Sequence, residues 1–173
     1  SADGTSVVTF SVETPELATR AFSDGTTATV LQYAVYDEEG NELPALTKSI
    51  ENANAETINM SRNVELKLTT GNTYSVVFWA AAPSAPYTVN FADKTMTVDY
   101  AAVCNDENRD AFYKCHEITV TGTQTEVIEL KRPFAQLNIG TSDYAASTSA
   151  GYTPEKSEVT VKQIYTTLNL ESG

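Results

Sequence analysis

Short stretches in which apolar and polar residues alternate run through most of the chain. In residues 7–13, the side chains of Val8, Phe10 and Val12 fall on one side and polar side chains fall on the other. This alternation predicts a half-buried β-strand. Residues 74–82 (YSVVFWAAA) are apolar on both sides, which predicts a central strand covered on both faces of its sheet.

Turn signals rich in Gly, Asn, Asp and Pro separate further stretches with strand character. Residues 43–50 follow a turn at 38–41 and are expected to return as a hairpin partner of the strand before it. The remaining strands are expected at 26–36, 64–68, 87–91, 95–100, 118–120, 126–139 and 158–170.

Helical patterns are nearly absent from the sequence. We expect one helical turn at 105–112 (NDENRDAF), capped by Asp106, and a loop rich in Ser, Thr, Ala and Gly at 141–154. With about nine strands and frequent turns, the sequence predicts an all-β protein, an antiparallel β-sandwich. The length of 173 residues favours a single domain spanning 1–173.

The charge balance excludes some classes of partner. The chain has 11 Lys and Arg against 23 Asp and Glu, giving a formal net charge of −12. Such a chain is not expected to bind nucleic acid or anionic lipid, because both need clustered cations. No apolar run is long enough to span a membrane. The acidic, Thr-, Ser- and Asn-rich texture is typical of exported proteins. The chain begins at Ser1 with no signal peptide, so either the protein is cytoplasmic or its leader has been removed.

The two cysteines and the single histidine are candidates for a catalytic or metal-binding site. Cys115 and His116 are neighbours, and neighbours on a strand point to opposite faces, so a catalytic Cys–His pair is not expected. With Cys104 they lack the close cysteine pair of structural zinc sites. The preferred interpretation is a disulfide between Cys104 and Cys115 in an oxidising compartment, and two free thiols are the alternative.

The other candidate sites are interpreted as structural features of the fold. The carboxylates of 37–39 and 106–110 have neither the spacing of a calcium loop nor a clear catalytic pairing, so we interpret them as solvated turns. Four aromatic residues could form a sugar-stacking platform, but aromatic residues in such strands usually belong to a core. They are Tyr74, Trp79, Tyr87 and Tyr100. We therefore expect no enzyme activity, no cofactor and no metal site.

Four segments carry a resemblance to a known family. They are KRPFAQLNIG (131–140), TRAFSDG (19–25), YSVVFWAAAP (74–83) and NDENRDAFY (105–113). In this order and spacing they resemble the fimbrillin superfamily, which comprises pilin subunits and tip adhesins of Gram-negative outer-membrane lipoprotein origin. The resemblance extends from about Val7 to Leu170.

This resemblance implies a fold and a location. The N-terminal domain of fimbrillins is a transthyretin-like β-sandwich of about seven to nine strands. Members are exported as lipoproteins with the lipid on an N-terminal cysteine, which is absent before Ser1 here. Full-length fimbrillins have a second β-domain, so residues 1–173 correspond to the N-terminal domain. A C-terminal domain is then missing from this chain, or the protein is a shorter relative.

The resemblance also implies a mode of assembly. In pilin members a trypsin-like protease cuts after an arginine behind the first strand, which makes Arg20 the expected cleavage residue and Ala21 the new N-terminus. The departing strand carries Val8, Phe10 and Val12, whose burial is worth roughly 5–8 kcal/mol before the ordering entropy is subtracted. Its loss would open an apolar groove that a strand from another subunit fills. Alternatively, Arg20 is an ordinary exposed loop residue.

The sequence therefore predicts a structural subunit, or an accessory or tip protein, of a cell-surface fimbria. Its expected partners are other fimbrial subunits, and its expected location is the outer surface of the outer membrane, reached through an N-terminal lipid. The alternative is a surface lipoprotein that does not polymerise and binds a host protein or glycan through loops such as 83–87 or 142–154.

Overall fold

The computed structural model describes residues 3–15, 25, 27–51, 61–100, 106, 109–135, 137 and 139–173. In these residues ten strands form three sheets, accompanied by a 3-10 turn, η1 (Pro44–Leu46), and one short helix, α1 (Tyr144–Ser149). No helix within these ranges is both long and apolar enough to cross a membrane.

Sheet A contains the first strand. Its order is β4 (Ser61–Thr69), β1 (Thr5–Glu13) and β9 (Gln124–Glu129). β1 runs antiparallel to β4 and parallel to β9. Because side chains alternate along a strand, this register turns Val8, Phe10 and Val12 of β1 to the same side.

Sheet B is the largest sheet. Its order is β3 (Lys48–Glu51), β2 (Val30–Tyr36), β5 (Thr73–Ala81) and β8 (Ala111–Thr119), and all of its pairs are antiparallel. β5 therefore lies between two long strands, and its last six residues are all buried. Such continuous burial requires cover on both faces of the sheet.

Sheet C covers the face of sheet B that is turned away from sheet A. It contains β10 (Thr167–Asn169), β7 (Thr95–Val98) and β6 (Tyr87–Asn90) in that order, again with antiparallel pairs. It contacts sheet B through Trp79 and Tyr87, whose ring centroids are 5.5 Å apart. The Tyr36 hydroxyl also donates a hydrogen bond of 2.6 Å to the Phe91 carbonyl.

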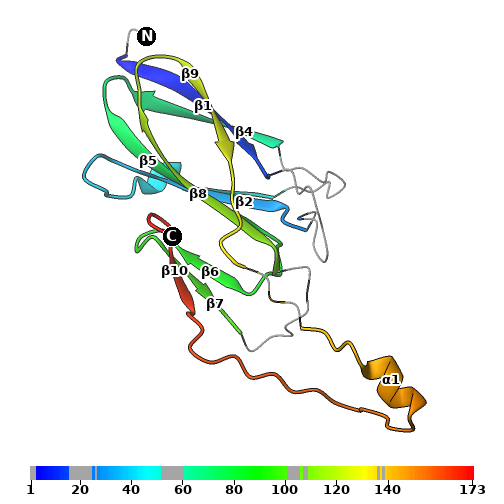
Figure 1. The fold of residues 1–173 in the computed structure, drawn as a ribbon. Coiled ribbons are helices and arrows are strands. Elements are labelled where there is room, and N and C mark those ends of the chain that lie inside the picture. The colour runs from blue at the N-terminus through cyan, green and yellow to red at the C-terminus, as the bar shows by residue number, and fades with distance from the viewer. Residues whose placement is uncertain are drawn as a thin grey trace. The chain divides into compact units, whose positions relative to one another are not determined.

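The sheets form three layers, with sheet B between sheets A and C (Figure 1). The larger core fills the space between sheets A and B and includes Phe10, Phe78 and Phe112. A smaller buried group on the other face of sheet B includes Trp79 and Met96, and Leu170 beside β10 belongs to it. The two-sided apolar pattern of β5 is therefore explained by two separate cores.

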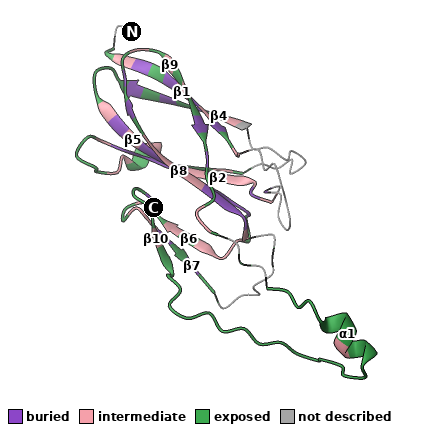
Figure 2. Ribbon diagram, viewed as in Figure 1, coloured by how far each residue is buried: buried purple, intermediate pink, exposed green. Residues whose placement is uncertain are grey.

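Residues 134–165 form a separate compact unit. This unit contains α1, whose residues are not buried, and it has most of the exposed large apolar side chains of the described chain (Figure 2). These side chains are Leu137, Ile139, Tyr144, Tyr152, Val159, Val161, Ile164 and Tyr165.

The fold class predicted from the sequence is confirmed: the protein is all-β, with antiparallel-rich sheets in a sandwich arrangement. The details differ in number and layering. The described residues contain ten strands, one more than expected, and a third layer is added to the usual two. The pair of β1 and β9 is parallel, which the antiparallel prediction did not anticipate.

Four predicted elements were wrong in extent. The strand expected at 118–120 is the end of β8, which begins at Ala111, so the helical turn expected over 105–112 is wrong at least for its last two residues. β8 lies at the edge of sheet B, where half-exposed polar residues are tolerated, and these conceal its pattern.

The other two errors lie near the C-terminal end. The strand expected over 126–139 ends at Glu129. Pro133 lacks the N–H that would continue a ladder. The strand expected over 158–170 is reduced to β10. Loop 141–154 includes the short helix α1.

Candidate assembly site around the first strand

The three apolar residues predicted to hold β1 in place are all fully buried. Val8, Phe10 and Val12 each have 0% exposed surface and belong to the core between sheets A and B. The Phe10 ring lies 5.6 Å from the Phe78 ring, centroid to centroid, at a tilt of 57°. Such aromatic contacts add to the free energy gained by burial. The inward face of β1 is thus a large contributor to this core.

β1 is the middle strand of its sheet, rather than an edge strand. On one side Phe10 pairs with Val64 of β4, and on the other side it pairs with Glu126 of β9. Removing β1 would therefore leave two facing rows of unpaired backbone groups above an apolar floor. A slot of this kind satisfies an incoming strand on both edges, which a single open edge does not.

Polar contacts fix both ends of β1 in the slot. At its start, the Ser6 and Thr70 hydroxyls are 2.8 Å apart, and the Thr70 N–H donates to the Gly4 carbonyl at 2.9 Å. At its end, the Leu130 N–H donates to the Glu13 carbonyl at 2.8 Å. These contacts set the register of β1 against both neighbours.

An ion pair lies close to where the chain returns after β1. Arg132 contacts both carboxylate oxygens of Asp110 through its two terminal nitrogens. The Gly25 N–H donates to Asp110 Oδ2 at 2.8 Å, and the Arg132 guanidinium lies 4.8 Å from the centre of the Phe112 ring. Asp110 is 7% exposed, so its charge requires these partners.

This cluster unites three of the four motifs that carried the resemblance. Gly25 closes TRAFSDG, Asp110 and Phe112 belong to NDENRDAFY, and Arg132 belongs to KRPFAQLNIG. The resemblance rests on these segments, but the sequence did not predict that they meet. The only available signal was opposite charge, since NDENRDAFY contains three acidic residues and KRPFAQLNIG begins with two basic ones.

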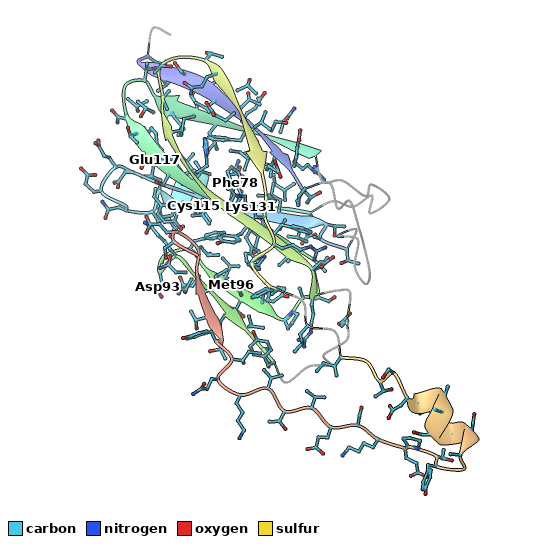
Figure 3. The ribbon with its side chains drawn as sticks, viewed as in Figure 1. Phe78, Asp93, Met96, Cys115, Glu117 and Lys131 are labelled. Atoms are coloured by element: carbon cyan, nitrogen blue, oxygen red, sulfur yellow. The ribbon has the colours of Figure 1, made fainter. Side chains whose placement is uncertain are left out.

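The predicted processing residues and one cysteine lie outside the described residues. These are Arg20, Ala21 and Cys104. Cys115 (labelled in Figure 3) lies half-buried on β8 and pairs with Val77 of β5, so its side chain is on the face of sheet B opposite to that of Phe78. It has no disulfide partner among the described residues. The disulfide with Cys104 stays a prediction. Burial raises the pKa of the Cys115 thiol, which makes the thiolate a minor species at neutral pH.

Two further titratable residues, His116 and Asp37, contact other residues of the fold. His116 Nε2 lies 3.5 Å from Glu126 Oε2, a long contact between β8 and β9 beside the Phe10 ring. Asp37 accepts hydrogen bonds from the backbone and side-chain nitrogens of Asn41, and these lower its pKa. No group of three or more His, Cys, Asp or Glu suited to a metal occurs in the described part of the chain.

Two of the proposed stacking aromatics belong to the interior. Tyr74 is 7% exposed and Trp79 is 2% exposed, so neither offers a ring face to solvent. The Tyr87 hydroxyl donates to the Arg109 carbonyl, and burial raises the pKa of Tyr87 to about 12. The interpretation that these aromatic residues belong to the core is therefore confirmed for Tyr74 and Trp79.

Solved structures that match this chain come from Bacteroides and Parabacteroides. A candidate polysaccharide-binding protein (DUF1812) of Bacteroides thetaiotaomicron VPI-5482 matches 73% of this chain and 47% of its own, at 18% identity and a TM-score of 0.51. A candidate adhesin from the same strain matches 75% and 46%, at 13% identity and a TM-score of 0.53. A fimbrial assembly protein of Parabacteroides distasonis ATCC 8503 is 14% identical over 74% of this chain and 52% of its own, with a TM-score of 0.40.

The first two structures show that the fold is shared, and the matched region spans about half of each of those longer chains. Comparison of the sequence with curated proteins found no match. A family model matches residues 2–173, which is almost the whole sequence. The chain therefore belongs to the family of unknown function DUF6562.

Proposed function

We propose that this protein is a structural or accessory subunit of a cell-surface fimbria, assembled by exchange of its first strand. The observation that carries this proposal is the position of β1, which lies between β4 and β9 with Val8, Phe10 and Val12 fully buried. A single cut in the connector between β1 and β2, at Arg20, would separate that strand from the rest of the fold. The slot would then accept a strand with apolar residues at alternate positions.

Strand exchange of this kind needs no catalytic group in the subunit. The slot has an apolar floor and two edges of unpaired backbone groups. A strand that enters covers the floor and forms hydrogen bonds with both edges. The driving force is the free energy of burial that β1 gave up, roughly 5–8 kcal/mol before entropy is subtracted. The proposal therefore assigns the chain a mechanical role and no enzyme activity.

Limited trypsin digestion tests the proposal directly. We expect a new N-terminus at Ala21, followed by growth of oligomers that light scattering and size-exclusion chromatography detect. The matched control is Arg20→Gln, which removes the cleavage residue and should leave the protein monomeric under the same treatment. Cleavage elsewhere, or a cut protein that stays monomeric, would count against strand exchange.

An engineered disulfide that can be reduced distinguishes cleavage of the connector from release of β1. Ser11 and Asn63 pair across β1 and β4 and both lie off the core face. Directly opposed residues in antiparallel strands are close enough for a disulfide. With Cys104 and Cys115 replaced by serine, the Ser11→Cys and Asn63→Cys pair should hold β1 after trypsin treatment. Addition of a reductant should then start oligomer growth.

The location and domain organisation follow from the same proposal. We place the protein at the outer surface of the outer membrane, held there by an N-terminal lipid, with residues 1–173 forming the N-terminal part of a fimbrillin-like subunit. The exposed apolar side chains of residues 134–165 support a further β-domain packed on that unit. A longer version of the protein should bind less of a hydrophobic dye per molecule than residues 1–173.

A surface adhesin that does not polymerise is the second candidate. The support for it is the fold shared with proteins described as a candidate adhesin and a candidate polysaccharide-binding protein. Its partner would be a host protein or glycan. Resistance of the Arg20 bond to trypsin, combined with saturable binding to cells or glycans, would favour this candidate over the fimbrial subunit.

A further inference from the structure

An open pocket of about 260 Å³ lies on the face of sheet B that is turned away from sheet A. The residues that form the floor of this pocket are brought together by the register of three strands. Val30 of β2 lies opposite Glu51 of β3 on one side and opposite Ala81 of β5 on the other. The short side chains of Val30 and Ala81 leave a hollow where longer residues would fill the space.

One side of this pocket is polar. Gln32 pairs with Ser49 across β2 and β3, one pleat along from the pair of Val30 and Glu51. The pocket is therefore bordered by an amide, a hydroxyl and a carboxylate on one face of the sheet. None of these three side chains makes a hydrogen bond or ion pair within the described ranges. Their polar atoms are available to a ligand.

The other side of the pocket is apolar and fixed in place. Trp79 and Tyr87 meet edge to face at 5.5 Å, and Pro83 and Ala85 line the pocket from the loop between them. The Tyr87 hydroxyl is bound to the Arg109 carbonyl, which holds its ring against Trp79. A ligand would meet aromatic and aliphatic carbons here.

We infer that this pocket binds one pyranose ring of a neutral glycan. A pyranose carries hydroxyl groups along its edge and C–H groups on its faces, which matches one polar and one apolar wall. The Glu51 carboxylate accepts two hydroxyl hydrogen bonds, and the Gln32 amide both donates and accepts. Cavities for larger ligands are typically about 300–1,000 Å³, so a volume of about 260 Å³ suits a single ring.

The lining residues exclude the main competing ligands. Among the described residues that line the pocket there is no Lys, Arg or His, so phosphate, sulfate and carboxylate groups find no cation there to pair with. The Glu51 carboxylate and the net charge of −12 repel anionic sugars. A neutral sugar is the class that remains. This inference does not depend on strand exchange, because the pocket lies across sheet B from β1.

Saturation-transfer NMR tests the inference, with methyl pyranosides of glucose, galactose, mannose and N-acetylglucosamine as probes and methyl glucuronide as the anionic comparison. We expect saturation transfer to at least one neutral pyranoside, with a dissociation constant of about 1 mM, and weaker transfer to the glucuronide. Transfer to none of the neutral pyranosides, or equal transfer to the glucuronide, would overturn the inference.

Substitutions on β3 test whether the sugar binds in this pocket. Ser49→Trp places a large ring in the pocket from an exposed edge strand and should weaken binding at least about tenfold. Lys48→Trp is the matched control, because it adds the same bulk to the opposite face of β3 and should leave binding unchanged. If Ser49→Trp lowers the melting temperature, Gln32→Ala and Glu51→Ala replace it and should each weaken binding about fivefold or more. Unchanged binding in all three pocket variants would place the sugar elsewhere.

Discussion

Arg132 forms a two-point ion pair with Asp110, and the two residues come from different motifs of the sequence. The Asp110 carboxylate is 7% exposed, whereas 32% of the Arg132 side-chain surface is exposed. The carboxylate also accepts the Gly25 N–H, so the pair fixes the chain where it returns toward β2. The fold beyond the proposed cleavage segment therefore has an anchor that does not depend on β1.

Arg132→Ala should lower the free energy of unfolding by about 2–3 kcal/mol, because it leaves the buried Asp110 charge without its cation. Urea denaturation measures this change. Lys131→Ala, at the exposed neighbouring position, is the control and should change stability by less than about 0.5 kcal/mol. Adding Asp110→Asn to Arg132→Ala should recover part of the loss. Equal effects of Arg132→Ala and Lys131→Ala would show that the pair does not stabilise the fold.

Phe10→Ala should lower the free energy of unfolding by about 3–5 kcal/mol, because it empties a fully buried site against Phe78. Ser11→Ala changes the other face of β1 and should cost far less. Thermal unfolding followed by circular dichroism measures both. A small loss for Phe10→Ala would mean that β1 contributes little to the core, and the burial argument for strand exchange would fail with it.

Cys115 should react slowly with iodoacetamide, because burial raises its pKa above the ordinary value of 9.0 and little thiolate forms. The stability gained from the neutral thiol is fully present below the ordinary pKa and is lost as the pH rises through the folded-state pKa. With Cys104→Ser as background, the pH dependence of alkylation followed by mass spectrometry gives the midpoint. A rate equal to that of glutathione at the same pH would contradict the burial of this thiol.

Asp37 should titrate below its ordinary pKa of 3.8, because Asn41 donates two hydrogen bonds to its carboxylate. Its contribution to stability is therefore present above that ordinary value and is lost as the pH falls through the folded-state pKa. Carboxyl ¹³C NMR measures the midpoint. Asn41→Ala removes the side-chain donor and should move the midpoint upward. An unchanged midpoint would assign the shift to the backbone of the turn alone.

The sequence alone was enough to place the strands with strong periodic patterns. Strict alternation located β1, and apolar residues on both faces identified β5 as a doubly covered central strand. β8 was missed over most of its length, because Lys114 to Glu117 are polar or half-exposed and hide the inward positions of Phe112 and Ile118. An edge strand needs less apolar surface, so its pattern is weaker.

Long-range pairing was beyond what a single sequence allows. Neither the parallel neighbour of β1 nor the contact of Asp110 with Arg132 leaves a local signature, because each joins segments far apart in the chain. The polar border of the pocket could not be predicted from the sequence for the same reason. Gln32, Ser49 and Glu51 are unremarkable one by one, and only strand register brings them together.

The parallel pair of β1 and β9 has a consequence for the order of folding. β1 is synthesised before all other strands, but its partner β9 arrives almost last, because Val8 pairs with Gln124. Contacts between such distant segments form slowly. A newly synthesised chain therefore passes through a stage in which the strands of sheet B can pair before β9 completes sheet A. A chaperone or a neighbouring chain has its best access to the first strand during that interval.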